Sequence, residues 1–96
     1  MYISGAENVY PPEVEQVLLK LGGVREAAVI GVPDEKWGEV GKAFIVKEDE
    51  ALSEESILKY CSANLAKYKI PKKIVFLAAL PKGDSGKILK RNLPRD

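Results

Sequence analysis

The chain has 96 residues, of which 46% are hydrophobic and 30% are charged, and its net charge is +1. This balance is typical of one small folded domain, and no apolar run approaches the roughly 20 residues of a membrane-spanning helix. With no histidine and a single cysteine, Cys61, the sequence excludes an internal disulfide, most metal sites and the usual nucleophile–base pairs. The lone cysteine and the lack of a secretory signal pattern favour a reducing, cytoplasmic location.

The N-terminal part predicts a short strand followed by a helix. Residues 1–5 form an extended segment that enters a turn, and the Pro11-Pro12 pair suits the first turn of a helix. Four apolar residues then follow at helical spacing, namely Val14, Val17, Leu18 and Leu21. The Gly22-Gly23 pair supplies the stop signal at the C-terminal end of this helix.

The remainder predicts two paired strands, a second helix, a third strand and a short terminal helix. The β-prone stretches 24–32 and 40–46 flank a loop that allows antiparallel pairing. Ser53 is a good N-cap for a helix whose apolar face consists of Leu58, Cys61 and Leu65. A strand over 73–77 and a helix over 87–93 complete the chain. We therefore expect a small α+β domain, with a three-stranded sheet and helices packed on one or both of its faces.

The charge is unevenly distributed along the chain. Residues 1–66 carry a net charge of −6, whereas residues 67–96 carry +7. A basic final third is typical of a surface that binds anionic groups such as phosphates. A solvated, lysine-rich surface without a ligand fits the same composition, and the sequence leaves both interpretations open.

A glycine-rich loop near the C-terminus ends in a lysine. Gly83, Ser85 and Gly86 predict a flexible loop whose backbone can approach a ligand closely. Lys87 follows at the start of the expected helix, where the helix dipole disfavours a cation. A residue placed against its local field is a candidate for a functional role, although a solvated lysine also tolerates such a position.

This loop is not a nucleotide-binding P-loop. The Walker A pattern would need glycine where Pro81 stands and serine or threonine where Ile88 stands. The dinucleotide-binding pattern G-x-G-x-x-G is absent as well. A further candidate is Trp37, which falls in a polar loop, where it either anchors the loop to the core or forms one side of a ligand groove.

Three segments together resemble the adenylate-forming superfamily of acyl-CoA synthetases, peptide-synthetase adenylation domains and luciferases. The segment ISGAENVYPPEVE is similar to the pattern G-G-E-N-[IV]-x-P-x-E-[IV]-E that follows the interdomain hinge. The segment VIGVPDEKWGEVGKAFIV resembles the pattern G-x-P-[DH]-x-x-x-G-E. The segment YKIPKKIVFLAALPKGDSGKILKR resembles the closing pattern P-[KR]-x-x-x-G-K-[IVL]-x-[KR]. They occur in the order and spacing of the superfamily and cover nearly the whole chain.

The resemblance implies the C-terminal lid domain of an ATP-dependent acyl-CoA synthetase for fatty or related acids. Such enzymes join a carboxylic acid to ATP, release pyrophosphate and pass the acyl group from the adenylate to CoA, releasing AMP. The resemblance places the ATP and acyl sites, and the Mg²⁺ that accompanies ATP, on a large N-terminal domain outside this chain. We therefore expect residues 1–96 to be a single lid domain, expressed as a fragment or separately, and inactive alone.

The resemblance also implies roles for individual residues. Lys87 matches the lysine that reaches the acyl carboxylate and the α-phosphate during adenylate formation. Gly5, Ala6, Glu7 and Trp37 match positions beside the pantetheine tunnel, where Ala6 departs from the usual glycine. Less specific matches to residues that contact the CoA nucleotide in some relatives are Tyr68, Lys69 and Lys72.

Two alternatives remain open on sequence. The chain fits equally the lid of a peptide-synthetase adenylation domain, which takes a carrier-protein pantetheine in place of CoA, or that of a luciferase-like enzyme. A free-standing module that binds a nucleotide, a nucleic acid or a protein through its basic tail is a third reading, with nucleic acid the weaker prospect. The acyl chain length and the oligomeric state are not encoded in these residues.

Overall fold

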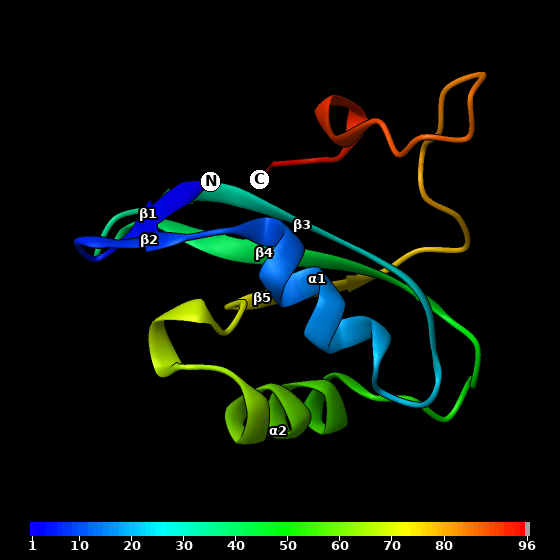
Figure 1. Ribbon diagram of the computed structural model, residues 1–96, viewed down its shortest axis with the longest axis horizontal. Helices are drawn as coiled ribbons and strands as arrows, with labels where there is room; N and C mark the ends of the chain where they lie inside the picture. Colours follow the sequence, from blue (N-terminus) through cyan, green and yellow to red (C-terminus); the bar gives the residue numbers. More distant parts are fainter. Residues whose placement is uncertain (96) are drawn as a thin grey trace.

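The computed structural model describes residues 1–95 as an α+β arrangement in layers (Figure 1). Within those residues the sheet has five strands: β1 (Tyr2–Ser4), β2 (Glu7–Val9), β3 (Val24–Asp34), β4 (Gly38–Lys47) and β5 (Lys73–Phe76). The helices are α1 (Pro11–Leu19), α2 (Glu54–Asn64) and the 3-10 turns η1 (Lys67–Lys69) and η2 (Lys90–Asn92). The α+β class is confirmed, whereas the sheet has more strands than the three expected, because β1 and β2 form a hairpin of their own.

The β3–β4 hairpin is the centre of the sheet. Its two strands pair antiparallel, as predicted, and the ladder extends as far as the pair Asp34–Gly38. Residues 35–37 alone therefore form the connecting turn, which is shorter than the loop expected from the sequence. Strand β5 pairs parallel with the later part of β4, and β1 meets β4 where Ser4 pairs with Gly38.

Both α-helices begin where local sequence signals place them. Helix α1 has Pro11 in its first turn, where the missing N–H removes no intrahelical bond. Before α2, the Ser53 hydroxyl accepts a hydrogen bond from the Ser56 N–H at 3.1 Å, and the Ser56 hydroxyl accepts one from the Ser53 N–H at 3.2 Å. Cys61 is fully buried, and burial raises the pKa of its thiol, which confirms it as a core residue.

Both faces of the sheet are apolar, and different structures cover them. Helices α1 and α2 lie on one face and enclose a core that includes Val14, Leu18, Val29, Ile45 and Ile57. The opposite face is covered by residues 77–95, drawn orange to red in Figure 1. This C-terminal tail contributes Leu80 and Leu93 to a second core around Phe44. The helices therefore cover one face only.

The helix expected over 87–93 is wrong. Only Lys90–Asn92 forms a 3-10 turn, and Lys87 lies in a hairpin arm. An isolated helix of this length is marginal in water. The extended path instead lets Ile88 and Leu93 pack against the sheet, so burial of apolar side chains decides the local conformation.

Candidate functional site

The two-residue turn between β1 and β2 has a strained backbone at Ala6. Gly5 and Ala6 both have positive φ angles, +58° and +72°, as a two-residue type I′ hairpin turn requires. Glycine adopts this region freely, whereas the methyl group of Ala6 makes it unfavourable. The turn is held to the neighbouring hairpin because the Gly5 N–H donates to the Trp37 carbonyl oxygen at 2.8 Å.

Trp37 lies in the tight turn between β3 and β4 and faces this glycine. The Asp34 carboxylate fixes the turn by accepting hydrogen bonds from the backbone N–H groups of Lys36 and Trp37, at 3.0 and 2.9 Å. A side-chain Cβ at Gly5 would lie 3.0 Å from Trp37 Cε3, so the ring packs directly on the turn. Two cations also lie near the Trp37 ring, since the Lys36 and Lys72 ammonium groups are 5.1 and 5.6 Å from its centroid.

A groove of about 410 Å³ opens beside Trp37 and brings together segments that are far apart in the sequence. All three motifs contribute predicted residues to its lining, which includes Gly5, Glu7, Trp37, Tyr68 and Lys72. Ser4 and Lys67 also line the groove and were not predicted from the sequence. The position of Lys67 next to Tyr68 was the available signal, but its orientation depends on the η1 turn.

Of the residues predicted to contact CoA, Ala6 and Lys69 lie outside the lining of this groove. Ala6 occupies the tip of the β1–β2 turn, next to Gly5. Lys69 forms an ion pair with Glu13 of α1 at 2.8 Å, and this hydrogen bond raises the pKa of Lys69. The cation at position 69 therefore fastens η1 to α1.

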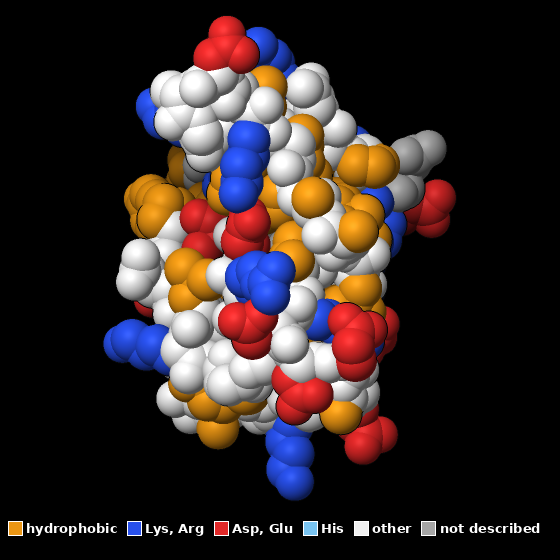
Figure 2. All heavy atoms as spheres, turned by 90° about the vertical axis from the view of Figure 1, so that its right-hand side faces the viewer, with side chains coloured by type: hydrophobic (Ala, Val, Ile, Leu, Met, Phe, Trp, Pro, Cys, Tyr) orange, Lys and Arg blue, Asp and Glu red, His pale blue; other side chains and the backbone are white. Residues whose placement is uncertain are grey.

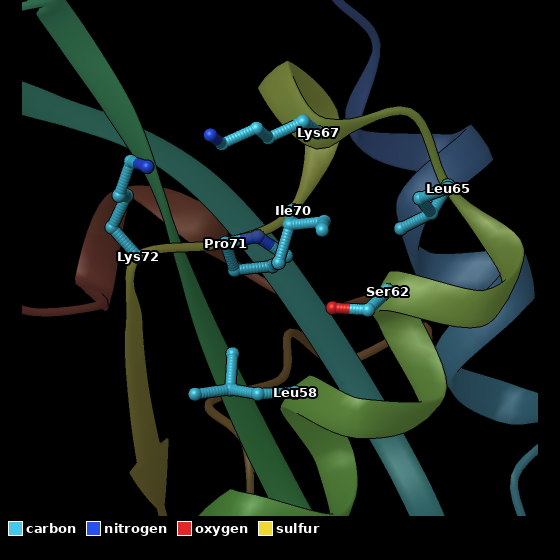
Figure 3. Close-up of a pocket in the computed structure, with 7 residues that line it drawn as sticks. All are labelled: Leu58, Ser62, Leu65, Lys67, Ile70, Pro71 and Lys72. Carbon is cyan, nitrogen blue, oxygen red and sulfur yellow. The ribbon is translucent and has the colours of Figure 1, made fainter.

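A second cleft, of about 490 Å³, adjoins the first (Figure 3). Leu58, Ser62 and Leu65 of α2 and its C-terminal end form one wall, and Ile70 and Pro71 form another. Lys67 and Lys72 line both clefts, and the ends of both side chains lie at the upper left of Figure 3. We call these two residues, which the second cleft shares with the groove beside Trp37, the lysine pair.

Lys87 lies on a separate hairpin of the tail. Pairing of Lys82 with Ile88 forms the base of this hairpin, and the Gly83 N–H donates to the Lys87 carbonyl oxygen at 2.9 Å. Gly86 closes the tip with a φ of +82°. The Lys87 side chain is exposed and forms no ion pair or hydrogen bond with any other side chain among residues 1–95. The helix dipole expected at Lys87 is wrong, because Lys87 lies in a hairpin and no helix begins there.

Residues 13–87 match the family described as AMP-binding enzyme C-terminal domain. The chain belongs to this family. It is 53% identical over 90 residues to the long-chain-fatty-acid–CoA ligase FadD13 of Mycobacterium tuberculosis, a match that covers 94% of this chain and 18% of the relative. A 2-succinylbenzoate–CoA ligase of Bacillus cereus is 52% identical over 93 residues, covering 97% of this chain and 19% of that protein.

Solved structures agree with this assignment. The structure of a fatty acyl CoA synthetase from Mycobacterium tuberculosis superimposes with a TM-score of 0.90 at 53% identity, over 95% of this chain and 18% of that one. An o-succinylbenzoate CoA synthetase from Bacillus subtilis, bound with a product analogue, gives 0.91 at 47% identity, over 96% and 19%. The AMP-binding C-terminal domain described here thus spans about a fifth of the length of these relatives, and its fold is theirs.

Three of the nine basic residues in the C-terminal third of this AMP-binding C-terminal domain form ion pairs within the described residues. Besides Lys69, two lysines of the tail form ion pairs: Lys82 with Glu26 at 2.9 Å and Lys90 with Glu15 at 2.7 Å. Figure 2 shows one end of the molecule, where basic and acidic side chains lie side by side instead of forming a patch of one sign. Part of the basic charge therefore attaches the tail to acidic residues of the N-terminal part, through Lys82 and Lys90.

The described part of the chain offers neither a metal-binding cluster nor a membrane-spanning helix. Among residues 1–95, no three His, Cys, Asp or Glu side chains are grouped so that they could hold a metal ion. None of the helices in that range has both the length and the apolar character needed to cross a membrane. The groove beside Trp37 and the Lys87 hairpin are thus the two features of this domain that call for a functional explanation.

Proposed function

We propose that this chain is the lid domain of an ATP-dependent acyl-CoA synthetase acting on a fatty or related carboxylic acid. In the first half-reaction a carboxylate oxygen attacks the α-phosphorus of ATP, forming an acyl-adenylate and releasing pyrophosphate. In the second, the CoA thiol attacks the acyl carbon, forming the thioester and releasing AMP. The observation that carries the proposal is the groove where Gly5, Trp37 and Lys72, from three segments of the chain, meet.

Lys87 serves the first half-reaction in this proposal. Its exposed, unpaired ammonium group on a projecting hairpin is suited to reach a cleft that another part of the protein provides. A cation there offsets the repulsion between the carboxylate and the phosphate and stabilises the charge that develops in the transition state. By analogy with the loss of an oxyanion-hole donor, its removal raises the barrier by about 3–4 kcal/mol.

The groove beside Trp37 serves the second half-reaction. We assign the part lined by Gly5 and Glu7 to the thin pantetheine arm of CoA, because a side chain at position 5 would meet the Trp37 ring. The nucleotide end of CoA then lies by Tyr68, a residue that is 38% exposed, and by the lysine pair. Of the three lysines in this region, Lys67 and Lys72 are better placed than Lys69, which Glu13 holds.

The two sites lie at different ends of the domain. In Figure 1 the β1–β2 turn is at the left, and the orange hairpin that carries Lys87 projects at the upper right. A single orientation of the domain therefore presents one of them to a common cleft. In this proposal the lid rotates between the half-reactions. The large N-terminal domain that binds ATP, Mg²⁺ and the acyl group is its partner in the cytoplasm.

A chimera tests the proposal. This chain replaces the matching C-terminal segment of the Mycobacterium tuberculosis FadD13 ligase, and pyrophosphate–ATP exchange and acyl-CoA formation are measured separately. We expect activity in the chimera and none in the truncated large domain alone. An inactive chimera beside an active, unmodified relative contradicts the proposal.

Single substitutions in the chimera then separate the two sites. Lys87→Ala should lower exchange at least about 100-fold, whereas Lys59→Ala, an exposed lysine on α2, should change nothing. Lys72→Ala should raise the KM for CoA and leave exchange intact. Full exchange in Lys87→Ala refutes the role of Lys87 in adenylate formation. An unchanged KM for CoA in Lys72→Ala refutes the assignment of Lys72 to CoA binding.

A further inference from the structure

Glu26 occupies an unusual position on the sheet face that the tail covers. Along β3, its neighbours on the same face are the buried, apolar Ala28 and Ile30. The Glu26 side chain is only 24% exposed, and its Oε2 lies 2.9 Å from the Lys82 Nζ. One acidic side chain at the end of an apolar row therefore meets the tail where its hairpin begins.

The residue that Glu26 holds is part of the hairpin that presents Lys87. Lys82 pairs across the hairpin with Ile88, the residue next to Lys87. The hydrogen bonds from the Gly83 N–H to the Lys87 carbonyl and from the Leu89 N–H to the Pro81 carbonyl, at 2.9 and 2.8 Å, fix the hairpin internally. They do not set its angle to the sheet, which depends on contacts between the hairpin and the sheet, namely the packing of Ile88 on the apolar face and the ion pair of Lys82 with Glu26.

A second ion pair fastens the segment that follows the hairpin. Lys90 Nζ lies 2.7 Å from Glu15 Oε2, and the same carboxylate oxygen accepts a hydrogen bond from the Val29 N–H at 2.8 Å. Because β3 is an edge strand, this N–H has no partner strand to bond with. Both sides of the hairpin are thus tied to β3, one directly and one through α1.

We propose that Glu26 and Lys82 are positioning residues for Lys87. Their ion pair fixes the angle at which the hairpin leaves the sheet, and therefore the place to which the Lys87 ammonium group is delivered. The inference rests on the proposed role of Lys87 in adenylate formation. A displacement of about 1 Å at a positioned group can cost about 100-fold in rate, so a modest ion pair can have a large effect on the reaction.

The first test uses the chain alone and does not depend on activity. Backbone ¹⁵N relaxation is measured for Lys82→Glu, for Glu26→Lys and for the double variant with the charges exchanged. We expect the Gly86 and Lys87 amides to become more mobile in each single variant and to regain their order in the double variant. The matched control is Arg25→Gln, which breaks the ion pair of Arg25 with Glu48 one residue along β3 and adds no negative charge beside Glu26. It should leave these amides unchanged.

The second test uses the chimera and separates the half-reactions. Each single charge reversal should lower pyrophosphate exchange about tenfold, and the exchanged pair should restore it to within about twofold. Thioester formation from preformed acyl-adenylate should stay within about twofold throughout, because it does not use Lys87. Arg25→Gln should leave both half-reactions intact.

The outcomes distinguish the two proposals. If Lys87→Ala retains full exchange, the proposed role of Lys87 fails. If Lys87→Ala loses exchange while Lys82→Glu and Glu26→Lys retain it, only the positioning proposal is overturned. Equal losses in both half-reactions, without rescue by the exchanged pair, indicate damage to the fold and overturn it as well.

Discussion

Tyr2 packs over the middle of the β3–β4 hairpin, and two glycines beneath it allow this contact. Gly31 and Gly41 face each other in the register of the two strands. A Cβ at Gly41 would lie 2.3 Å from the Tyr2 hydroxyl oxygen and 3.3 Å from Pro71 Cα. A Cβ at Gly31 would instead lie 2.5 Å from Tyr2 Cβ and 2.7 Å from its Cγ. The two positions therefore clash with different parts of one side chain.

The geometry predicts that the Tyr2 hydroxyl is energetically coupled to position 41 and not to position 31. Gly41→Ala places a carbon about 1 Å closer to the hydroxyl than ordinary contact allows, so we expect a loss of about 1–3 kcal/mol in the free energy of unfolding. Tyr2→Phe removes the offending oxygen, and the nearest remaining atoms are 3.3 Å away. In that background the cost of Gly41→Ala should fall by about 1–2 kcal/mol. Gly31→Ala should show no such relief, because phenylalanine keeps the Cβ and Cγ that clash.

Urea unfolding of the chain measures these couplings. The set comprises Tyr2→Phe, Gly41→Ala, Gly31→Ala and the two double variants. Tyr2→Phe alone should be neutral or slightly stabilising, because the hydroxyl is buried without a hydrogen-bond partner among the described residues. Equal coupling at both glycines, or none at Gly41, refutes the packing described for Tyr2.

Three further predictions concern alkaline pH, the β1–β2 turn and the α2 cap. Burial, with a smaller contribution from the Glu39 charge, raises the pKa of the Tyr2 hydroxyl to about 12. In the unfolded chain the same hydroxyl loses its proton near pH 10, so the free energy of unfolding should fall between about pH 10 and 12. Tyr2→Phe should remove that part of the decline in urea titrations, and an identical decline in both proteins contradicts the burial. Ala6→Gly should stabilise the chain by about 1 kcal/mol because it relieves the strained φ of +72°, and a lower urea midpoint would count against it. Ser53→Ala should cost about 1 kcal/mol through loss of the N-cap, and an unchanged midpoint would show that the cap contributes nothing.

The sequence predicted the parts of the structure that depend on neighbouring residues. Pro11 and Ser53 marked the starts of α1 and α2, because capping depends on backbone groups a few residues away. The two β-prone stretches and the length of the loop between them predicted the antiparallel pairing of β3 with β4. The three motifs predicted the family, which the match over residues 13–87 confirms.

Only the tertiary structure decided how distant segments meet. Residues 87–93 form no α-helix because Ile88 and Leu93 instead cover the second face of the sheet. The groove beside Trp37 exists because β1, the β3–β4 turn and η1 converge. Lys82 and Lys90 are attachment points and Lys87 is not, although all three read alike as lysines in a basic tail. Burial and pairing of charge depend on contacts between residues far apart in the chain, and local spacing carries no record of those contacts.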